Sequence, residues 1–136
     1  MITYKEFTPS PQQFNMLTDS VGWGTRDESV VEKALANSLF CLGAFDGDAL
    51  IGFARIIGDE TIFLYIQDVM VIPEYQGQKV GTGIMKKLIE KINEYKKVNN
   101  GIRTYLGASA GKEDFYKRFG FDTRAGAGLG PGMVLF

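Results

Sequence analysis

The stretch that decides the fold is IFLYIQDVMVIPEYQGQKVGTGIMKKLIEKINEY, residues 62–95. It begins with an apolar run, which Pro73 ends, and a glycine-rich segment follows. From Val80 onward, apolar side chains recur every fourth residue, with lysines and glutamates between them. This order predicts a buried strand, a loop and an amphipathic helix that packs on a sheet. Because a helix start presents unpaired backbone N–H groups and a positive dipole end, we expect an anion to bind at this junction.

The rest of the chain alternates between strand-like and helix-like patterns. Strands are expected at residues 2–7, 39–45, 49–57, 61–72, 102–106 and 133–136, with a further strand or a turn beginning at Phe121. Helices are expected at residues 11–19, 26–37 and 112–119, and between residue 98 and a glycine loop that holds Gly77, Gly81 and Gly83. Ser10 is expected to cap the first helix, and a Thr25–Glu28 capping box is expected at the second. The alternation predicts an α/β or α+β layered sheet with helices on both faces.

The composition limits the class of protein. The chain has 136 residues, 45% hydrophobic and 23% charged, which suits one globular domain over residues 1–136. The net charge of −1 gives no sign of a nucleic-acid or membrane-surface binder, and the N-terminus has no apolar signal region. One cysteine and no histidine make a disulfide or a zinc site unexpected and exclude Ser-His and Cys-His nucleophilic pairs. We therefore expect a cytoplasmic protein without a metal.

Three phosphate-binding motifs use glycines as this loop does. The P-loop needs Gly-Lys-Ser/Thr, which the chain lacks, and the dinucleotide fingerprint needs a third glycine where Lys86 stands. The third motif, Q/R-x-x-G-x-G/A between a strand and a helix, matches QKVGTG at residues 78–83 in full. At this point the chain resembles the GCN5-related N-acetyltransferase (GNAT) superfamily. A second segment, FYKRFGF at residues 115–121, is similar to that family's F-Y-x-x-x-G-F segment, and the two motifs in this order make the resemblance specific.

The resemblance implies the acyl-CoA N-acyltransferase fold, a mixed, mostly antiparallel central sheet of about six to seven strands with helices on both faces. It also implies that acetyl-CoA is the co-substrate and that its acetyl group passes directly to a primary amine. The loop amides would bind the pyrophosphate of coenzyme A, and the backbone of the preceding strand would pair with the pantetheine amides. The residues implied for cofactor binding are Val69, Met70, Val71, Gly77, Gln78, Lys79, Val80, Gly81, Thr82, Gly83 and Ser109, the last standing where the family often has an asparagine.

The resemblance also assigns catalytic roles. Tyr116 matches the family's general acid, which protonates the departing thiolate. Asp68, in the expected central strand, is a candidate base acting directly or through water; the alternative is a hydrogen-bonded strand residue, and Gln67 is the fallback polar group. In a regular strand Asp68 would point opposite to its neighbours, and a β-bulge would change that. Trp23, between two glycines, is expected to face the acceptor substrate.

Three functions remain open at this level. The first is an N-acetyltransferase acting on a small-molecule amine. The second is a non-catalytic acyl-CoA-binding sensor, suggested by Ser109 and by the undefined base. The third is an acetyltransferase for a protein or aminoacyl-tRNA amine, although the near-neutral charge disfavours a phosphate-rich partner. The small-molecule amine is preferred, no nucleic-acid or membrane partner is expected, and a homodimer through residues 133–136 is compatible with the sequence.

Overall fold

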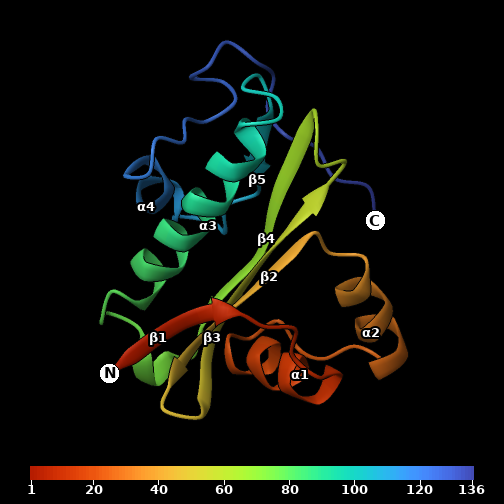
Figure 1. Cartoon of the computed structure of the whole chain (residues 1–136), viewed down its shortest axis with the longest axis vertical. Helices are drawn as coiled ribbons and strands as arrows, with labels where there is room; N and C mark the ends of the chain where they lie inside the picture. The colour runs from red at the N-terminus through yellow and green to blue at the C-terminus, as the bar shows by residue number, and fades with distance from the viewer. The chain divides into compact units, whose positions relative to one another are not determined.

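The computed structural model describes all 136 residues, which form two compact units, Met1–Tyr105 and Leu106–Phe136 (Figure 1). The elements follow in the order β1 (Ile2–Glu6), α1 (Pro11–Ser20), α2 (Glu28–Ala36), β2 (Phe40–Asp46), β3 (Ala49–Gly58), β4 (Phe63–Val71), the 3-10 helix η1 (Pro73–Tyr75), α3 (Val80–Lys96), β5 (Arg103–Leu106) and α4 (Glu113–Lys117). The expected strand, loop and helix around residues 62–95 are therefore present. The single domain over residues 1–136 stays a prediction.

The strands form one sheet in the order β1-β2-β3-β4-β5. Neighbours among the first four are antiparallel, which confirms a mostly antiparallel sheet. The expectation of six to seven strands is wrong, because the sheet has five and neither Phe121 nor residues 133–136 are in a strand. The side chains of Met133, Leu135 and Phe136 are almost fully exposed. Apolar composition alone does not make a strand, which also needs a neighbouring strand to pair with.

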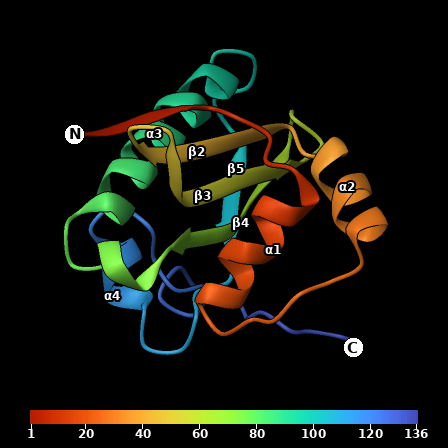
Figure 2. The same cartoon turned by 90° about the horizontal axis from the view of Figure 1, so that it is seen from below.

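Helices cover both faces of this sheet, as expected (Figure 2). On one face, α1 and α2 pack on the sheet through a core of Phe14, Leu17, Val31, Leu35, Cys41, Phe45, Leu50, Phe53 and Met70. On the other face, α3 buries one side of its surface, formed by Val80, Ile84, Met85, Leu88, Ile92 and Tyr95. These α3 positions follow the every-fourth-residue pattern of the sequence, because only one stripe of a helix can face the sheet.

Helix starts were predicted with mixed success. Ser10 caps α1 in a capping box, in which its Oγ accepts from Gln13 N and its N donates to Gln13 Oε1, as expected for the N-cap. The capping box from Thr25 to Glu28 is wrong, since Asp27 is the N-cap of α2 and Glu28 is its first residue. The Glu28 carboxylate instead accepts a hydrogen bond from Gln12 Nε2 at 2.6 Å. A contact with another helix has replaced the local cap.

An irregularity in β4 shows whether the strand is regular at Asp68. Phe53 pairs with Met70 and Arg55 pairs with Gln67, so β3 advances two residues where β4 advances three. The extra residue is a β-bulge, and Asp68 adopts a left-handed backbone with φ of 57°. The bulge turns the Asp68 carboxylate to the side of the sheet where Arg55 lies. Asp68 is therefore not placed as in a regular strand.

Candidate active site

The start of α3 is an uncapped helix N-terminus. The chain turns through Gly77 and Lys79, which have φ of 80° and 64°. Lys79 occupies the N-cap position, but its side chain makes no capping hydrogen bond. The first bond of the turn runs from Gly83 N to Lys79 O at 3.1 Å. The amides of the three residues between them therefore precede the helical ladder, and the first turn holds no acidic residue. This end of the helix offers backbone donors and a positive dipole to an anion.

The structure corrects the place of two motif glycines. We expected Gly81 and Gly83 in the loop, but α3 begins at Val80 and both lie in its first turn. Gly83 has its own structural reason to lack a side chain, since a Cβ there would collide with the phenol of Tyr4 from β1. Tyr4 thus closes over the first turn of α3, and Gly83 is required by packing within the protein as well as by any ligand.

This close approach gives a testable prediction. Gly83→Ala should lower the free energy of unfolding by about 1 kcal/mol, because overpacking against Tyr4 outweighs the better helix propensity of alanine. In a Tyr4→Ala background the same change should raise it by up to about 1 kcal/mol. Urea unfolding of the four proteins of this cycle measures both values. An equal effect of Gly83→Ala in both backgrounds would contradict the role of Tyr4.

Side-chain hydrogen bonds stabilise the segment before α3 and join it to the sheet. Gln78 Nε2 donates to Glu74 O at 3.0 Å, and Gln76 Nε2 donates to Val71 O at 2.9 Å. Tyr75 Oη donates a short hydrogen bond to the carboxylate of Asp46, at the end of β2, and this bond is the chief cause of the raised pKa of the Tyr75 phenol. Gln78 therefore shapes the loop through its side chain. The loop is held in place before any ligand binds.

The end of β4 nearest this loop contains Val69, Met70 and Val71. Met70 is buried in the core under α1 and α2, whereas its two neighbours are half-buried. Strand β5 has four residues against nine in β4, so it can pair with less than half of that edge. Contacts between the two strands fall at the far end of β4, where Arg103 N donates to Ile62 O and Tyr105 stacks on Tyr65. The edge of β4 beside residues 69–71 can therefore pair with an extended ligand.

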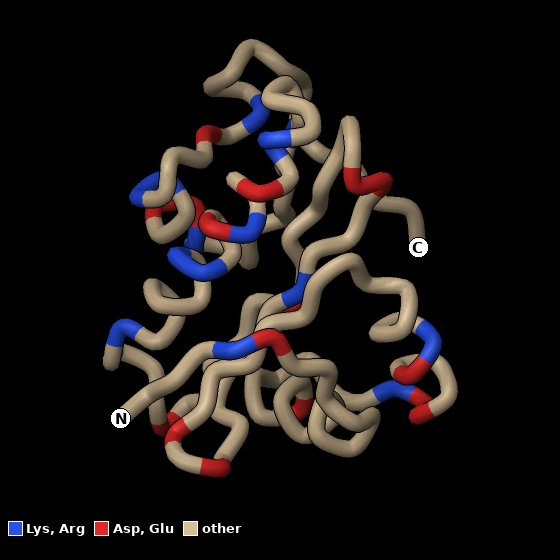
Figure 3. The backbone as a smooth tube through the Cα atoms, in the orientation of Figure 1, with Lys and Arg blue, Asp and Glu red and all other residues tan.

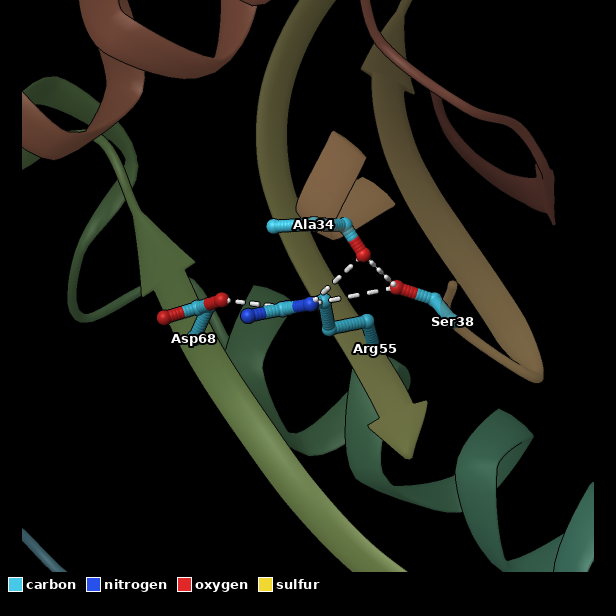
Figure 4. Close-up of polar contacts among 4 residues, drawn as sticks. All are labelled: Ala34, Ser38, Arg55 and Asp68. Atoms are coloured by element: carbon cyan, nitrogen blue, oxygen red, sulfur yellow. Dashed lines mark hydrogen bonds and ion pairs between the residues drawn. The ribbon is translucent and has the colours of Figure 1, made fainter. Parts of the chain in front are cut away.

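Asp68 belongs to a polar cluster that spans three elements (Figure 4). Arg55 Nε donates to Asp68 Oδ2 at 2.6 Å, and Arg55 Nη1 donates to Ala34 O and Ser38 Oγ, each at 3.2 Å. The Arg55 and Asp68 side chains are only 17% and 19% exposed. The sequence reasoning missed Arg55. Its one signal was a lone charged residue within the apolar strand ALIGFARIIG.

Two predicted acceptor-side residues lie on different elements. Gln67 is half-buried on β4 and is paired in register with Arg55, so it lies beside the polar cluster. Trp23 lies in the loop between α1 and α2, where its ring is 46% exposed. Trp23 N donates to Thr18 O of α1 at 2.9 Å, and Thr18 Oγ1 donates to Gly24 O of the loop at 2.6 Å. The loop thus fixes the tryptophan backbone and leaves its ring outside the core.

The second unit, residues 106–136, carries Tyr116 and Ser109. Tyr116 lies on α4 within a cluster of aromatic rings, with centroids 5.1 Å from Phe115 and 6.3 Å from Phe121. Burial raises the pKa of the Tyr116 phenol above its ordinary 10.0, so the group is protonated at neutral pH. Ser109 is exposed, and its carbonyl accepts from Lys112 N at 2.9 Å in the turn before α4.

Comparison with known proteins decides the family. Residues 10–128 match the family model described as an acetyltransferase (GNAT) domain, which is most of the chain. The chain belongs to the GNAT family. This GNAT domain is also 38% identical over 114 residues to a protein of Prochlorococcus marinus named an uncharacterized N-acetyltransferase, ycf52-like. That match covers 80% of the chain and 61% of the relative, so the chain spans about three fifths of the relative's length.

Solved structures of an acetyltransferase and of a probable acetyltransferase have the same fold. A probable acetyltransferase from methicillin-resistant Staphylococcus aureus superposes with a TM-score of 0.88 at 29% identity, covering 100% of this chain and 99% of that one. A GNAT-family acetyltransferase from Elizabethkingia anophelis with acetyl-CoA bound has a TM-score of 0.67 at 19% identity, covering 90% and 76% of the two chains. The second likeness concerns the fold alone. No helix of this GNAT domain combines the length and apolarity needed to cross a bilayer.

Proposed function

We propose that this GNAT domain transfers the acetyl group of acetyl-CoA directly to the primary amine of a small molecule. The observation that carries the proposal is the uncapped N-terminus of α3 next to the partly unpaired edge of β4. The first feature suits the negatively charged pyrophosphate of coenzyme A, and the second suits the amides of its pantetheine arm. Such a pair of adjacent features fits a ligand that has a phosphate group at one end and peptide-like bonds beyond it.

The cofactor-binding roles follow from these two features. The backbone of Val80, Gly81 and Thr82 in the first turn of α3 would bind the pyrophosphate, together with Gly83 of the same turn and Gly77, Gln78 and Lys79 of the preceding loop. The backbone of Val69, Met70 and Val71 would pair with pantetheine, and Ser109 would supply the further polar contact that the family often takes from asparagine. The β4 assignments use main-chain groups, so they are compatible with the buried Met70 side chain.

The chemistry needs one proton acceptor and one proton donor. The acceptor amine arrives as an ammonium ion, and Asp68 would take its proton directly or through water, with Gln67 beside it and Trp23 facing the substrate. The amine nitrogen then bonds to the thioester carbonyl carbon, and the carbon–sulfur bond breaks. The thiolate leaves with the electron pair and takes the phenolic proton of Tyr116, which is protonated at neutral pH. The bonded nitrogen loses its second proton through water to the resulting phenolate, so that the amide is neutral and Tyr116 is restored.

The charge distribution favours a small acceptor over a nucleic acid. Two glutamates lie among the lysines of α3 (Figure 3), and ion pairs join Lys87 to Glu90 at 3.4 Å and Lys91 to Glu94 at 3.5 Å. Within each pair the two charges offset each other, so this helix has no uniformly basic surface. A phosphate-rich partner would require such a surface. We also propose a cytoplasmic location. The single cysteine, Cys41, is free and buried, as is compatible with a reducing compartment.

Two measurements test the function. Isothermal titration with acetyl-CoA should give saturable binding, and heat at the level of buffer dilution with millimolar ligand would end the proposal. A panel of tyramine, spermidine, glucosamine, kanamycin and alanine amide with acetyl-CoA should release free thiol for at least one amine. Binding without thiol release across the panel would favour the acyl-CoA sensor. Acetylation of a protein or aminoacyl-tRNA but of no panel amine would favour the macromolecular acceptor.

A further inference from the structure

Arg55 connects the bulge of β4 to the end of helix α2 (Figure 4). The two sides of its guanidinium contact different parts of the fold. Nε donates to Asp68 Oδ2 on β4, and Nη1 donates to Ala34 O on α2 and to Ser38 Oγ just after it. Ala34 lies in the last turn of α2, where backbone carbonyls lack helical partners and the dipole is negative. The arginine is therefore fixed by α2 on one side and fixes Asp68 on the other.

Packing alone does not explain a charged pair at this place. Arg55 occupies a strand whose neighbouring side chains are buried and apolar, and removing two charges from water offsets most of their attraction. A pair of apolar side chains would stabilise the fold about as well. The planar guanidinium does provide what apolar groups cannot, a fixed direction for the carboxylate it binds. The pair is better suited to orientation than to stability.

The backbone conformation and the contacts of Asp68 support a role of the pair in orientation. Asp68 has a left-handed backbone, with φ of 57°, and its bulge separates it from the regular ladder of β4. Such strained residues persist where the surrounding structure holds them, and they cluster at functional sites. The carboxylate contacts use Oδ2 only, and the other oxygen points away from Arg55 (Figure 4). One carboxylate oxygen is thus held while the other remains able to accept a hydrogen bond.

We propose that Arg55 is a positioning residue for the acceptor amine. It holds Asp68 by Oδ2, so that Oδ1 accepts a hydrogen bond from the amine and orients it. This inference rests on the proposed function, and it adds a residue and a substrate contact to it. Arg55 itself touches neither acetyl-CoA nor the amine in this scheme. Its loss should therefore affect the amine and leave the binding of acetyl-CoA unchanged.

Steady-state kinetics of Arg55→Gln, Asp68→Asn and the double variant test the proposal, using whichever panel amine the wild type acetylates fastest. Each variant should lose roughly 10- to 100-fold in kcat/KM for the amine, with the KM for acetyl-CoA within about twofold of wild type. The double variant should lose no more than the singles, because both residues act as one unit. Its Tm should lie above those of the singles, since it leaves no unpaired buried charge.

Comparing Tm with kcat/KM distinguishes a structural role of the Arg55–Asp68 pair from a role in positioning the amine. If the double variant regains activity together with Tm, the pair is only structural and the proposal is overturned. An unchanged kcat/KM in Arg55→Gln overturns it as well. Arg55→Lys, which keeps the charge but not the planar fork, is the second variant should Arg55→Gln fail to fold. It should also have a lowered kcat/KM for the amine, and a wild-type value would overturn the proposal.

A control variant and the activity of the wild type are needed to interpret these kinetics. Lys91→Gln removes one partner of an ion pair with Glu94, 3.5 Å away on α3, in which the two side chains are 31% and 61% exposed, and should leave all kinetic constants unchanged. A wild type that acetylates no amine would overturn the proposed function and this inference together. An active wild type with an unaffected Arg55→Gln variant would overturn this inference alone.

Discussion

Replacing Tyr116 by phenylalanine is expected to lower kcat by roughly 10²- to 10³-fold, because the departing thiolate loses its proton donor. The Kd for acetyl-CoA should change by less than about twofold, since the phenylalanine ring keeps the contacts with Phe115 and Phe121. Stopped-flow or steady-state assays of thiol release give kcat, and isothermal titration gives the Kd. A kcat equal to that of the wild type would remove Tyr116 from the acid role.

The pH dependence gives the same experiment a second readout. Burial raises the pKa of the Tyr116 phenol above 10.0, so its proton is present throughout the neutral range and is lost only as the pH rises through that raised value. The wild type should therefore show no alkaline loss of kcat from this group below pH 10.0. Tyr95→Phe is the matched control, because burial also raises the pKa of this phenol and Tyr95 lies on the buried face of α3. Its kcat should be unchanged.

The second large effect is expected from a negative charge at the start of α3. Thr82→Glu places a carboxylate in the first turn, where it should raise the free energy of unfolding by about 0.3–1 kcal/mol through the helix dipole. The same charge should weaken acetyl-CoA binding by roughly 10- to 100-fold, because it repels the pyrophosphate and competes for the same amides. Stability and affinity should thus change in opposite directions, as measured by urea unfolding and isothermal titration.

Gln13→Glu is the matched control for this charge. Gln13 is the third residue of α1, as Thr82 is of α3, and glutamate there can keep the capping box with Ser10. The control should change stability by a similar small amount and leave acetyl-CoA affinity unaltered. If Thr82→Glu binds acetyl-CoA as tightly as the wild type, the pyrophosphate does not lie at the α3 N-terminus.

The predictable part of the fold was the part encoded by local periodicity. The every-fourth-residue pattern after Val80 gave α3 and its buried face, and Ser10 before Pro11 gave the start of α1. Errors arose where a local pattern depends on a distant partner. Residues 133–136 are apolar but form no strand, and their side chains are exposed. Thr25 has the spacing of a cap, but Glu28 bonds to Gln12 on another helix instead.

The candidate site divides in the same way. The glycine motif and the family could be predicted from the sequence, because closely spaced residues define a strand, a turn and a helix start. The reason for one of its glycines could not, since Tyr4 reaches Gly83 from another strand. The β-bulge was weighed as an alternative only, because a bulge depends on how two strands pair and not on the residues of one.

The sequence by itself determined the order of strands β1 to β5 and of the helices between them, the strand–loop–helix junction before α3 and the GNAT family, since each depends on residues near one another in the chain. Only the tertiary structure decided that α3 starts before Gly81, that Asp68 leaves the regular ladder, and that Arg55 holds its carboxylate. Arg55 and Asp68 are 13 residues apart and meet because β3 and β4 pair in a register with one extra residue. No periodicity within a single segment encodes that meeting, because the free energy that fixes it comes from packing between strands and helices.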